Sequence, residues 1–415
     1  MQGVTLTAAP DVIELPALAL VLLVGVPGSG RSAFARHFAP DEVFDARAFP
    51  DADALRAAVV ARLAAGELAV VIAPAVRPLE RAPWSALARE HDVKAVAVLL
   101  DEDRAVLEAR AGGTLSREEL IAQVSELRRT AGGLRAEGFR QAWHLRGEQI
   151  GRVGVRRVPL RVDRRDLQGP FDLIGDVHGC LEELRDLLTR LGYVPDGESV
   201  TPPAGRTAVF LGDLTDRGPD SAGVLRLVMG MVASGAALCV TGNHDEKLLR
   251  ALSGKAVKAL HGLDVTLAQL EAAGPAFQAQ VRTFLEGLPA HLMLDGGRLI
   301  AAHGGLPAHL HGRGSGRARS FALYGDTTGE RDELGLPVRR DWAAGYAGAP
   351  LVAYGHTPHA APRWVGNTVN LDTGCAFGGA LTALRYPERE TLSVPARAVY
   401  APPPRPLPPG QPPQA

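Results

Sequence analysis

Cysteine is scarce in this chain of 415 residues. The three cysteines are Cys180, Cys239 and Cys375, and no two of them have the CxxC spacing. An odd number without paired spacing argues against a disulfide framework and against a zinc knuckle. The sequence therefore favours a reducing compartment, and we expect the protein to be cytoplasmic.

Long apolar runs and an excess of charge of either sign are also missing. The early apolar run at residues 15–24 is too short to span a bilayer, and no signal-peptide pattern precedes it. The formal net charge is −1, which provides no general attraction to nucleic acids or membranes. We expect no contact with a membrane, and the sequence leaves the oligomeric state open.

The first half of the chain, residues 1–150, alternates between two patterns. Apolar runs at residues 17–24, 68–72 and 93–100 predict buried strands, and residues 52–64 and 116–138 have helical patterns. Strands that alternate with helices favour an α/β domain with a parallel sheet. The following residues, 151–170, are rich in arginine and predict a basic linker.

The second half has a different pattern. From residue 171 to residue 400, short strands end in turns and amphipathic helices lie between them, for example at residues 181–191 and 222–233. This pattern predicts an α+β domain, a β-sandwich flanked by helices. Residues 401–415 contain eight prolines and predict a disordered tail, which could also bind a proline-recognising domain.

Five short segments in the second half carry metal-ligand side chains on glycine-framed turns. They are GDVHG, GDLTDRG, GNHDE, AHGG and YGHTP, and each follows a β-rich apolar run. Together they offer six donors: Asp176, His178, Asp213, Asn243, His303 and His356. Six ligands are enough for two adjacent divalent ions if the carboxylate of Asp213 bridges them. Imidazole with carboxylate suits Mn, Fe, Zn or Ni better than Ca or Mg.

Two metal ions are a device for in-line displacement at phosphorus, so the segments predict a phosphoesterase. His244 follows the ligand Asn243 directly and is the expected general acid toward the leaving group. We expect Asp216 to orient His244, and Arg217 to bind phosphate oxygens. The alternative for each residue is ordinary turn chemistry, and Asp216 in particular could cap a helix or turn.

The series GDVHG, GDLTDRGPDS, GNHDEK, AAHGG and YGHTP resembles the calcineurin-like metallophosphoesterases of the phosphoprotein-phosphatase type. The segments GRGSGRARSFALYGDTTGE and VNLDTGCAFGGALTALRYPER are similar to the phosphatase domain of bacterial polynucleotide kinase-phosphatases, which repair RNA. The resemblance implies that Asp372 matters for activity and that Mn²⁺ or Ni²⁺ activates, with Fe and Zn as alternatives. It also implies 3′- or 2′-phosphate ends and 2′,3′-cyclic phosphates as substrates.

A phosphate-binding loop is predicted in the first half. The segment GVPGSGRS follows a strand and opens a helix, so Gly25, Gly28 and Gly30 would let backbone amides cradle phosphate. The motif has Arg31 where lysine is expected, while Ser32 could bind Mg²⁺. ATP with Mg²⁺ is the candidate ligand of this loop.

The position of this loop resembles the 5′-hydroxyl kinase domain of the same family. The segment IAPAV stands where that domain carries Asp-Ala-Thr-Asn, and Asp45-Ala46-Arg47 replaces a pattern of Asp-x-x-Arg. These departures favour a degenerate kinase domain over an active one, because phosphoryl transfer depends on positioning such groups. The family's third domain, an adenylyl-transferring ligase, is expected to be absent.

The combined interpretation is a two-metal phosphoesterase that acts at RNA or DNA ends, joined to a kinase-like domain of doubtful activity. A separate ligase is a candidate partner. Two alternatives remain within the enzyme class: a phosphoprotein phosphatase and a dinucleoside polyphosphate hydrolase. A third alternative is a regulatory subunit that uses the first half as a nucleotide sensor.

Overall fold

The computed structural model describes residues 11–110, 115–197, 199–333, 335–403 and 405–412. It divides the chain into two compact units, one that runs to Leu160 and also includes Arg313–Ser315, and one that contains the remaining residues from Arg161. The predicted linker at residues 151–170 is therefore not a separate segment. Its first part forms β7 (Gly154–Val158), which pairs in parallel with β1 (Val12–Pro16) and so belongs to the N-terminal unit. Residues 161–170 belong to the C-terminal unit.

The N-terminal unit contains a five-stranded, fully parallel sheet. Its strands lie in the order β3, β4, β2, β5, β6, with the first of them along the chain in the centre. They span Val43–Asp45, Ala69–Ile72, Ala19–Val24, Lys94–Asp101 and Gln141–Arg146. Strands β2 and β4 are buried along their whole length, which explains their uninterrupted apolar sequences. The predicted α/β domain with a parallel sheet is confirmed.

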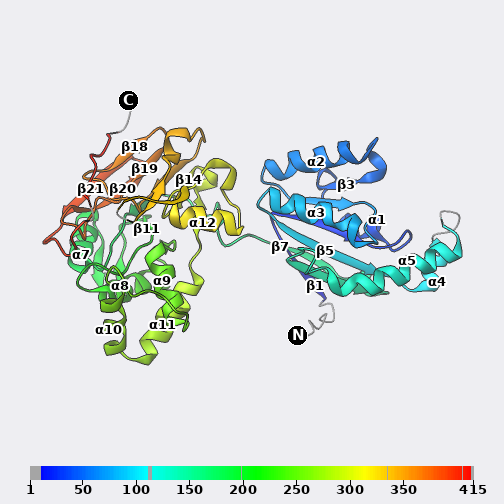
Figure 1. Ribbon diagram of the computed structural model, residues 1–415, viewed down its shortest axis with the longest axis horizontal. Coiled ribbons are helices and arrows are strands. Elements are labelled where there is room, and N and C mark those ends of the chain that lie inside the picture. Colours follow the sequence, from blue (N-terminus) through cyan, green and yellow to red (C-terminus); the bar gives the residue numbers. More distant parts are fainter. Residues whose placement is uncertain (1–10, 111–114, 198, 334, 404, 413–415) are drawn as a thin grey trace. The chain divides into compact units, whose positions relative to one another are not determined.

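Helices cover both faces of this parallel sheet (Figure 1). On one face, α2, α3 and α5 contribute apolar residues such as Leu55, Leu87 and Leu127, while α1 and α6 pack on the other. The helices are α1 (Arg31–Phe34), α2 (Ala52–Ala64), α3 (Pro78–Glu90), α4 (Arg104–Arg110), α5 (Arg117–Thr130) and α6 (Gln149–Arg152). Helix α5 is shorter than the predicted helix at residues 116–138, because a 3₁₀ turn containing two glycines follows it.

The C-terminal unit is built on two five-stranded mixed sheets. The first has the order β12, β11, β8, β20, β21, and the second has the order β13, β14, β17, β19, β18. In the first sheet the strands span Ala237–Cys239, Thr207–Phe210, Phe171–Ile174, Ala380–Tyr386 and Glu390–Pro395. In the second they span His291–Leu294, Leu299–Ala302, Leu351–Tyr354, Thr368–Asn370 and Arg363–Val365. Two short hairpins, β9–β10 (Val194–Asp196, Ser199–Thr201) and β15–β16 (Thr327–Arg331, Pro337–Arg339), complete the unit.

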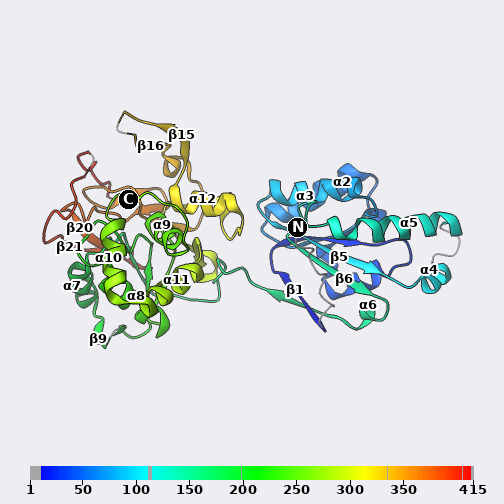
Figure 2. The same ribbon diagram turned by 60° about the horizontal axis from the view of Figure 1, so that its bottom comes forward.

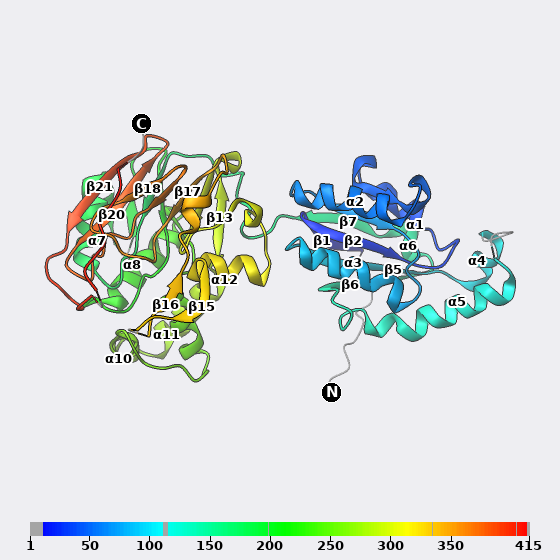
Figure 3. The ribbon, with the colours of Figure 1, turned by 45° about the horizontal axis from the view of Figure 1, so that its top comes forward.

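The two sheets of the C-terminal unit pack face to face. Phe171, Val209 and Leu299 are among the buried residues that fill the space between them. The outer face of the first sheet is covered by α7 (Leu181–Leu191), α8 (Ser221–Ala233), α9 (Asn243–Leu252), α10 (Leu263–Ala273) and α11 (Pro275–Gly287). Helix α12 (Gly316–Tyr324) packs on the second sheet (Figure 3). The β15–β16 hairpin projects from the unit (Figure 2). The predicted β-sandwich flanked by helices is confirmed.

The proline-rich tail is not disordered over its described part. The backbone N–H of Trp364 on β18 donates to the carbonyl of Gln411, and the N–H of Gln411 donates to the carbonyl of Pro362. Proline lacks an N–H, but its carbonyl still accepts, as Pro408 does from Ala360. A proline-rich segment can therefore lie along a sheet edge. In the described part of the chain, no helix is both long and apolar enough to cross a membrane.

Candidate metal centre

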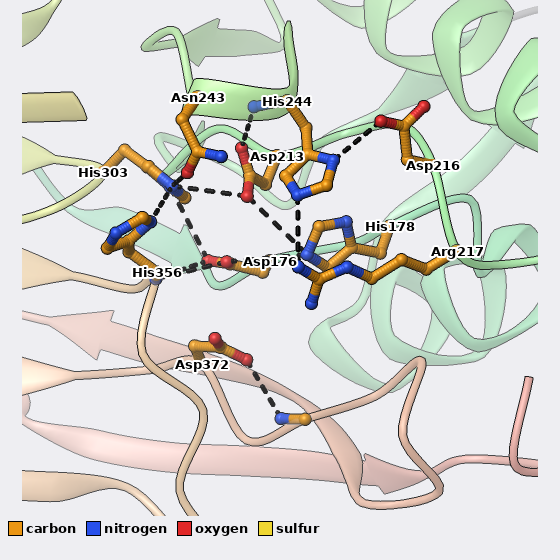
Figure 4. Close-up of polar contacts among 12 residues, drawn as sticks. Asp176, His178, Asp213, Asp216, Arg217, Asn243, His244, His303, His356 and Asp372 are labelled. Carbon is orange, nitrogen blue, oxygen red and sulfur yellow. Dashed lines mark hydrogen bonds and ion pairs between the residues drawn. The ribbon is translucent and has the colours of Figure 1, made fainter. Parts of the chain in front are cut away.

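The five glycine-framed turns all lie at the carboxyl ends of strands. Asp176 and His178 follow β8, and Asp213 follows β11, which is parallel to β8. Asn243 follows β12, while His303 and His356 follow the parallel strands β14 and β17 of the second sheet. The turns from both sheets therefore lie together at the carboxyl ends of these strands, where the side chains point toward one another (Figure 4).

The glycines of these turns are required by close backbone packing. A Cβ on Gly242 would lie 2.1 Å from Oδ1 of Asp213, and a Cβ on Gly355 would lie 2.0 Å from Oδ1 of Asp176. Several neighbours of these glycines have positive φ angles although they are not glycine: 47° at His178, 49° at Asp213 and 73° at His356. Such left-handed conformations cost energy and cluster at functional sites.

Backbone carbonyls fix the orientation of two predicted ligand imidazoles. Nδ1 of His178 lies 2.9 Å from the carbonyl oxygen of Thr215, and Nδ1 of His303 lies 3.1 Å from that of Leu211. A carbonyl can only accept, so Nδ1 carries a proton in each ring and Nε2 is the atom turned toward the centre. These Nε2 atoms lie 3.6 Å and 3.3 Å from Oδ2 of Asp213. A backbone acceptor behind each ring is the usual support of a metal-ligating histidine.

The remaining donors gather on the other side of Asp213. Oδ1 of Asn243 and Nδ1 of His356 each lie 2.9 Å from Nε2 of His303. Asp213 belongs to two groups whose ligand atoms lie within 4.8 Å of one another, one with His303 and His356 and one with His178 and His244. The arrangement fits two cations that share this carboxylate. All six predicted ligands are brought together, and their coordination of metal stays a prediction.

The charges of the site suit cations. Burial and the charge of Asp372 raise the pKa of Asp176, and burial raises the pKa of Asp372 to about 6. Burial lowers the pKa of His178 and of His356, so both imidazoles are neutral, which is the form that binds metal. Burial would raise the pKa of Asp213, but the adjacent His303 holds it well below its ordinary value.

His244 and its neighbours form a second group beside the predicted ligands. Nδ1 of His244 lies 2.7 Å from Oδ2 of Asp216, and Nη2 of Arg217 lies 3.1 Å from Nε2 of His244. The hydroxyl of Thr266 donates to Oδ1 of Asp216 at 2.7 Å. The guanidinium of Arg217 lies over the ring of Phe377 at 4.7 Å, a cation–π contact that helps to hold it in place. These contacts match the predicted roles of His244, Asp216 and Arg217, which remain untested.

The position of Asp372 is consistent with a supporting role. It follows β19, and its Oδ1 accepts the backbone N–H of Gly374 at 3.0 Å. It is buried, and its charge raises the pKa of Asp176.

Sequence reasoning missed two residues of the site. Nη2 of Arg339, on β16, lies 2.9 Å from Nε2 of His356. No local pattern in the segment LPVRRDW indicated that its hairpin reaches the centre. Asp245 accepts the backbone N–H groups of Gly242 and Leu214, which ties two of the turns together. Its place three residues after the N-cap of α9 was a signal that could have identified it.

Two side chains of the predicted phosphate-binding loop, Arg31 and Ser32, are engaged in hydrogen bonds within the protein. Gly28 and Gly30 have φ angles of 83° and 91°, as a tight turn needs. Nη1 of Arg31 donates to the carbonyl of Ala73 at 2.8 Å, and Oγ of Ser32 accepts from Arg47 at 2.9 Å. Gly25 is packed against the same loop. Binding of ATP and Mg²⁺ by this loop stays a prediction.

Comparisons with known proteins concern the second half of the chain. The model of the family "Calcineurin-like phosphoesterase" matches residues 169–370. The asymmetrical bis(5′-nucleosyl)-tetraphosphatase PrpE of Anoxybacillus flavithermus is 47% identical over 234 residues, 55% of this chain and 96% of that protein. Its counterpart in Bacillus subtilis is 45% identical over 234 residues, with the same coverage. A solved structure provisionally described as a diadenosine tetraphosphatase is 26% identical and covers 57% of this chain and 97% of its own, with a TM-score of 0.43.

These matches correct part of the sequence interpretation. They support the calcineurin-like domain, but they give no support to a kinase-like first half or to a polynucleotide kinase-phosphatase identity. The named relatives fit the alternative of a dinucleoside polyphosphate hydrolase better than repair of nucleic-acid ends. The resemblance misled because the glycine-framed turns specify the metal chemistry and not the group attached to the phosphate. The expected nucleic-acid and ligase partners remain untested.

Proposed function

The chain belongs to the calcineurin-like phosphoesterase family, and from this membership we propose that its C-terminal unit hydrolyses dinucleoside polyphosphates with two divalent cations. A metal-dependent phosphoesterase is the activity that the family and the relatives support. The finer proposal rests on one structural observation, the convergence of five turns on Asp213, combined with the substrate in the relatives' names. Unequal cleavage of a tetraphosphate gives a nucleoside monophosphate and a nucleoside triphosphate.

The donors divide between two cations. Asp176 and His178 would hold one cation, Asn243, His303 and His356 the other, and Asp213 both. When bound, such a pair supplies a hydroxide nucleophile near neutral pH and neutralises charge on the phosphoryl oxygens. Mn²⁺ is the ion with which we expect the highest activity, and Ni²⁺ is the alternative.

The side chains of the protein perform the remaining tasks. Arg217 and Arg339 contact the centre through different histidines, His244 and His356, and each presents a planar fork of donors to phosphate oxygens. A polyphosphate chain carries several anionic groups, so two guanidinium groups suit it better than one. His244 is placed to give a proton to the leaving oxygen, while Asp216 keeps its ring oriented.

The test is a panel of substrates assayed with Mn²⁺ and resolved by anion-exchange chromatography. The panel contains diadenosine tetraphosphate, 3′-phosphorylated RNA, 3′-phosphorylated DNA, a 2′,3′-cyclic phosphate and a phosphopeptide. We expect the highest kcat/KM for the tetraphosphate, with AMP and ATP as products. Two molecules of ADP would contradict unequal cleavage, and a preference for a 3′-phosphate end would return the function to nucleic-acid repair.

A further inference from the structure

Three potential metal donors outside the centre lie together in the core of the C-terminal unit. They are the thiols of Cys180 and Cys375 and the carboxylate of Glu183, whose ligand atoms are all within 4.8 Å of one another. All three residues are buried, with exposures of 0%, 2% and 0%. Cys180 and Glu183 lie one turn apart at the start of α7, and Cys375 lies in the segment between β19 and β20.

The carboxylate of Glu183 is only half satisfied. Its Oε1 accepts the backbone N–H of Arg397 at 2.9 Å and the hydroxyl of Tyr400 at 2.8 Å. Its Oε2 is buried and has no hydrogen-bond partner among the described residues. The guanidinium of Arg397 does not approach this oxygen for an ion pair but binds Glu182 and Asp186 instead. A buried carboxylate oxygen without a partner is costly, and such a group calls for an explanation.

We propose that Cys180, Glu183 and Cys375 form a third metal site, specific for a thiophilic cation such as Zn²⁺. Thiolate and carboxylate are both zinc ligands, and the three residues would fill three of the four positions of a tetrahedral zinc, while hard ions such as Mg²⁺ avoid thiolate. A triangle with sides of at most 4.8 Å places its centre within about 2.8 Å of each corner, whereas a zinc–sulfur bond is about 2.3 Å. A movement of about half an ångström would therefore close the donors around an ion.

The site would join the two loops that support the catalytic centre. Cys180 follows the predicted ligand His178 by two residues, and Cys375 follows Asp372 by three. On binding, the two thiol protons leave to solvent and the carboxylate of Glu183 gains a cation. The ion would have a structural role, because it would tie the start of α7 to the segment between β19 and β20. This proposal is independent of the substrate proposed above.

Sulfur ligation gives the test a readout that the catalytic centre cannot supply. None of the six predicted ligands there is a cysteine, so Co²⁺ bound by them produces no thiolate-to-cobalt charge-transfer absorption in the near ultraviolet. We expect the intact chain, reduced, stripped of metal and titrated with Co²⁺ alone, to develop this absorption. Native mass spectrometry of the same protein with Zn²⁺ is expected to show three ions per chain.

Variants locate the sulfur donors. We expect C375A and E183Q to weaken the site at least about ten-fold, as loss of metal-site partners generally does. C239A is the matched control, because Cys239 is also buried but lies outside the cluster. In C239A the absorption should be unchanged.

Three results would overturn the proposal. One is the absence of charge-transfer absorption in the intact, reduced chain, and this measurement needs no variant to fold. Another is absorption that persists in C375A. The third is a chain that binds no more than two zinc ions. Because none of these experiments measures hydrolysis, a failure here leaves the proposed function standing, and the substrate panel can fail without affecting this site.

Discussion

Replacing His244 by alanine separates its predicted role as general acid from a structural role. The imidazole lies 2.7 Å from Asp216 and 3.1 Å from Arg217, so it is held between an anion and a cation at the edge of the metal-ligand cluster. A proton donor matters when the leaving oxygen is strongly basic and matters little when it is weakly basic. The expected effect of H244A therefore depends on the substrate.

The magnitude follows from the usual contribution of general acid catalysis, about 10²–10⁴-fold. Phenyl phosphate releases a phenol with a pKa near that of tyrosine, about 10, and we expect H244A to lower its kcat/KM by about 10³-fold, or roughly 4 kcal/mol. The better leaving group of p-nitrophenyl phosphate should limit the loss to about ten-fold or less. Both rates are measured with Mn²⁺ at saturating metal.

Two further variants test the support of the ring. D216N removes a charged hydrogen-bond partner, an interaction worth about 1.5–3 kcal/mol, and is expected to lower kcat for phenyl phosphate by about 10–150-fold. T266V removes only the hydroxyl that donates to Asp216 at 2.7 Å and should cost less than D216N. Equal losses of H244A on both aryl phosphates, or no loss, would refute the general-acid role.

Three other variants or assays test separate parts of the chain. G242A should lower kcat by about 10²-fold, because its Cβ would lie 2.1 Å from Oδ1 of Asp213 and a shift of about 1 Å in a catalytic group has that effect. The control is G287A, whose Cβ meets nothing within 4 Å and which should leave kcat unchanged. R206M should reduce the free energy of unfolding of the C-terminal unit, measured by urea denaturation, by about 3–5 kcal/mol, because it leaves the buried Asp172 on β8 without its main cation. A loss below about 1 kcal/mol would contradict this. The unaltered chain should transfer no labelled phosphate from ATP to a 5′-hydroxyl oligonucleotide, because Arg31 is already bound to a backbone carbonyl; labelled product would show an active kinase.

Much of the fold could be predicted from local patterns. The predicted helices at residues 52–64 and 181–191 coincide with α2 and α7, and the predicted strand at residues 93–100 is shifted by one residue in β5. These elements have uninterrupted periodicity, and burial of one face or of the whole strand enforces it. The linker and the tail were mispredicted because their backbone partners, β1 and β18, lie far away along the chain.

The donor atoms of the metal centre were readable in the sequence because each turn carries its own constraint. Gly175 and Gly212, the glycines next to Asp176 and Asp213, lie where another backbone segment approaches too closely for a side chain. The residues of each turn therefore indicate its backbone geometry. No glycine or other local residue pattern identified Arg339 as part of the site. It reaches His356 only because the β15–β16 hairpin folds back toward the strand ends, and the contact between Thr266 and Asp216 likewise spans 50 residues.

The residues of each turn therefore predicted which atoms can bind metal, whereas long-range packing determined which charged side chains surround those atoms. Turn residues are selected by backbone sterics within a few positions, and this information stays in the segment itself. The two sheets had to pack before Asp213 could lie between two sets of donors and before Cys375 could approach Cys180. Such encounters depend on the register and stacking of strands that are far apart in the chain, which no short segment encodes.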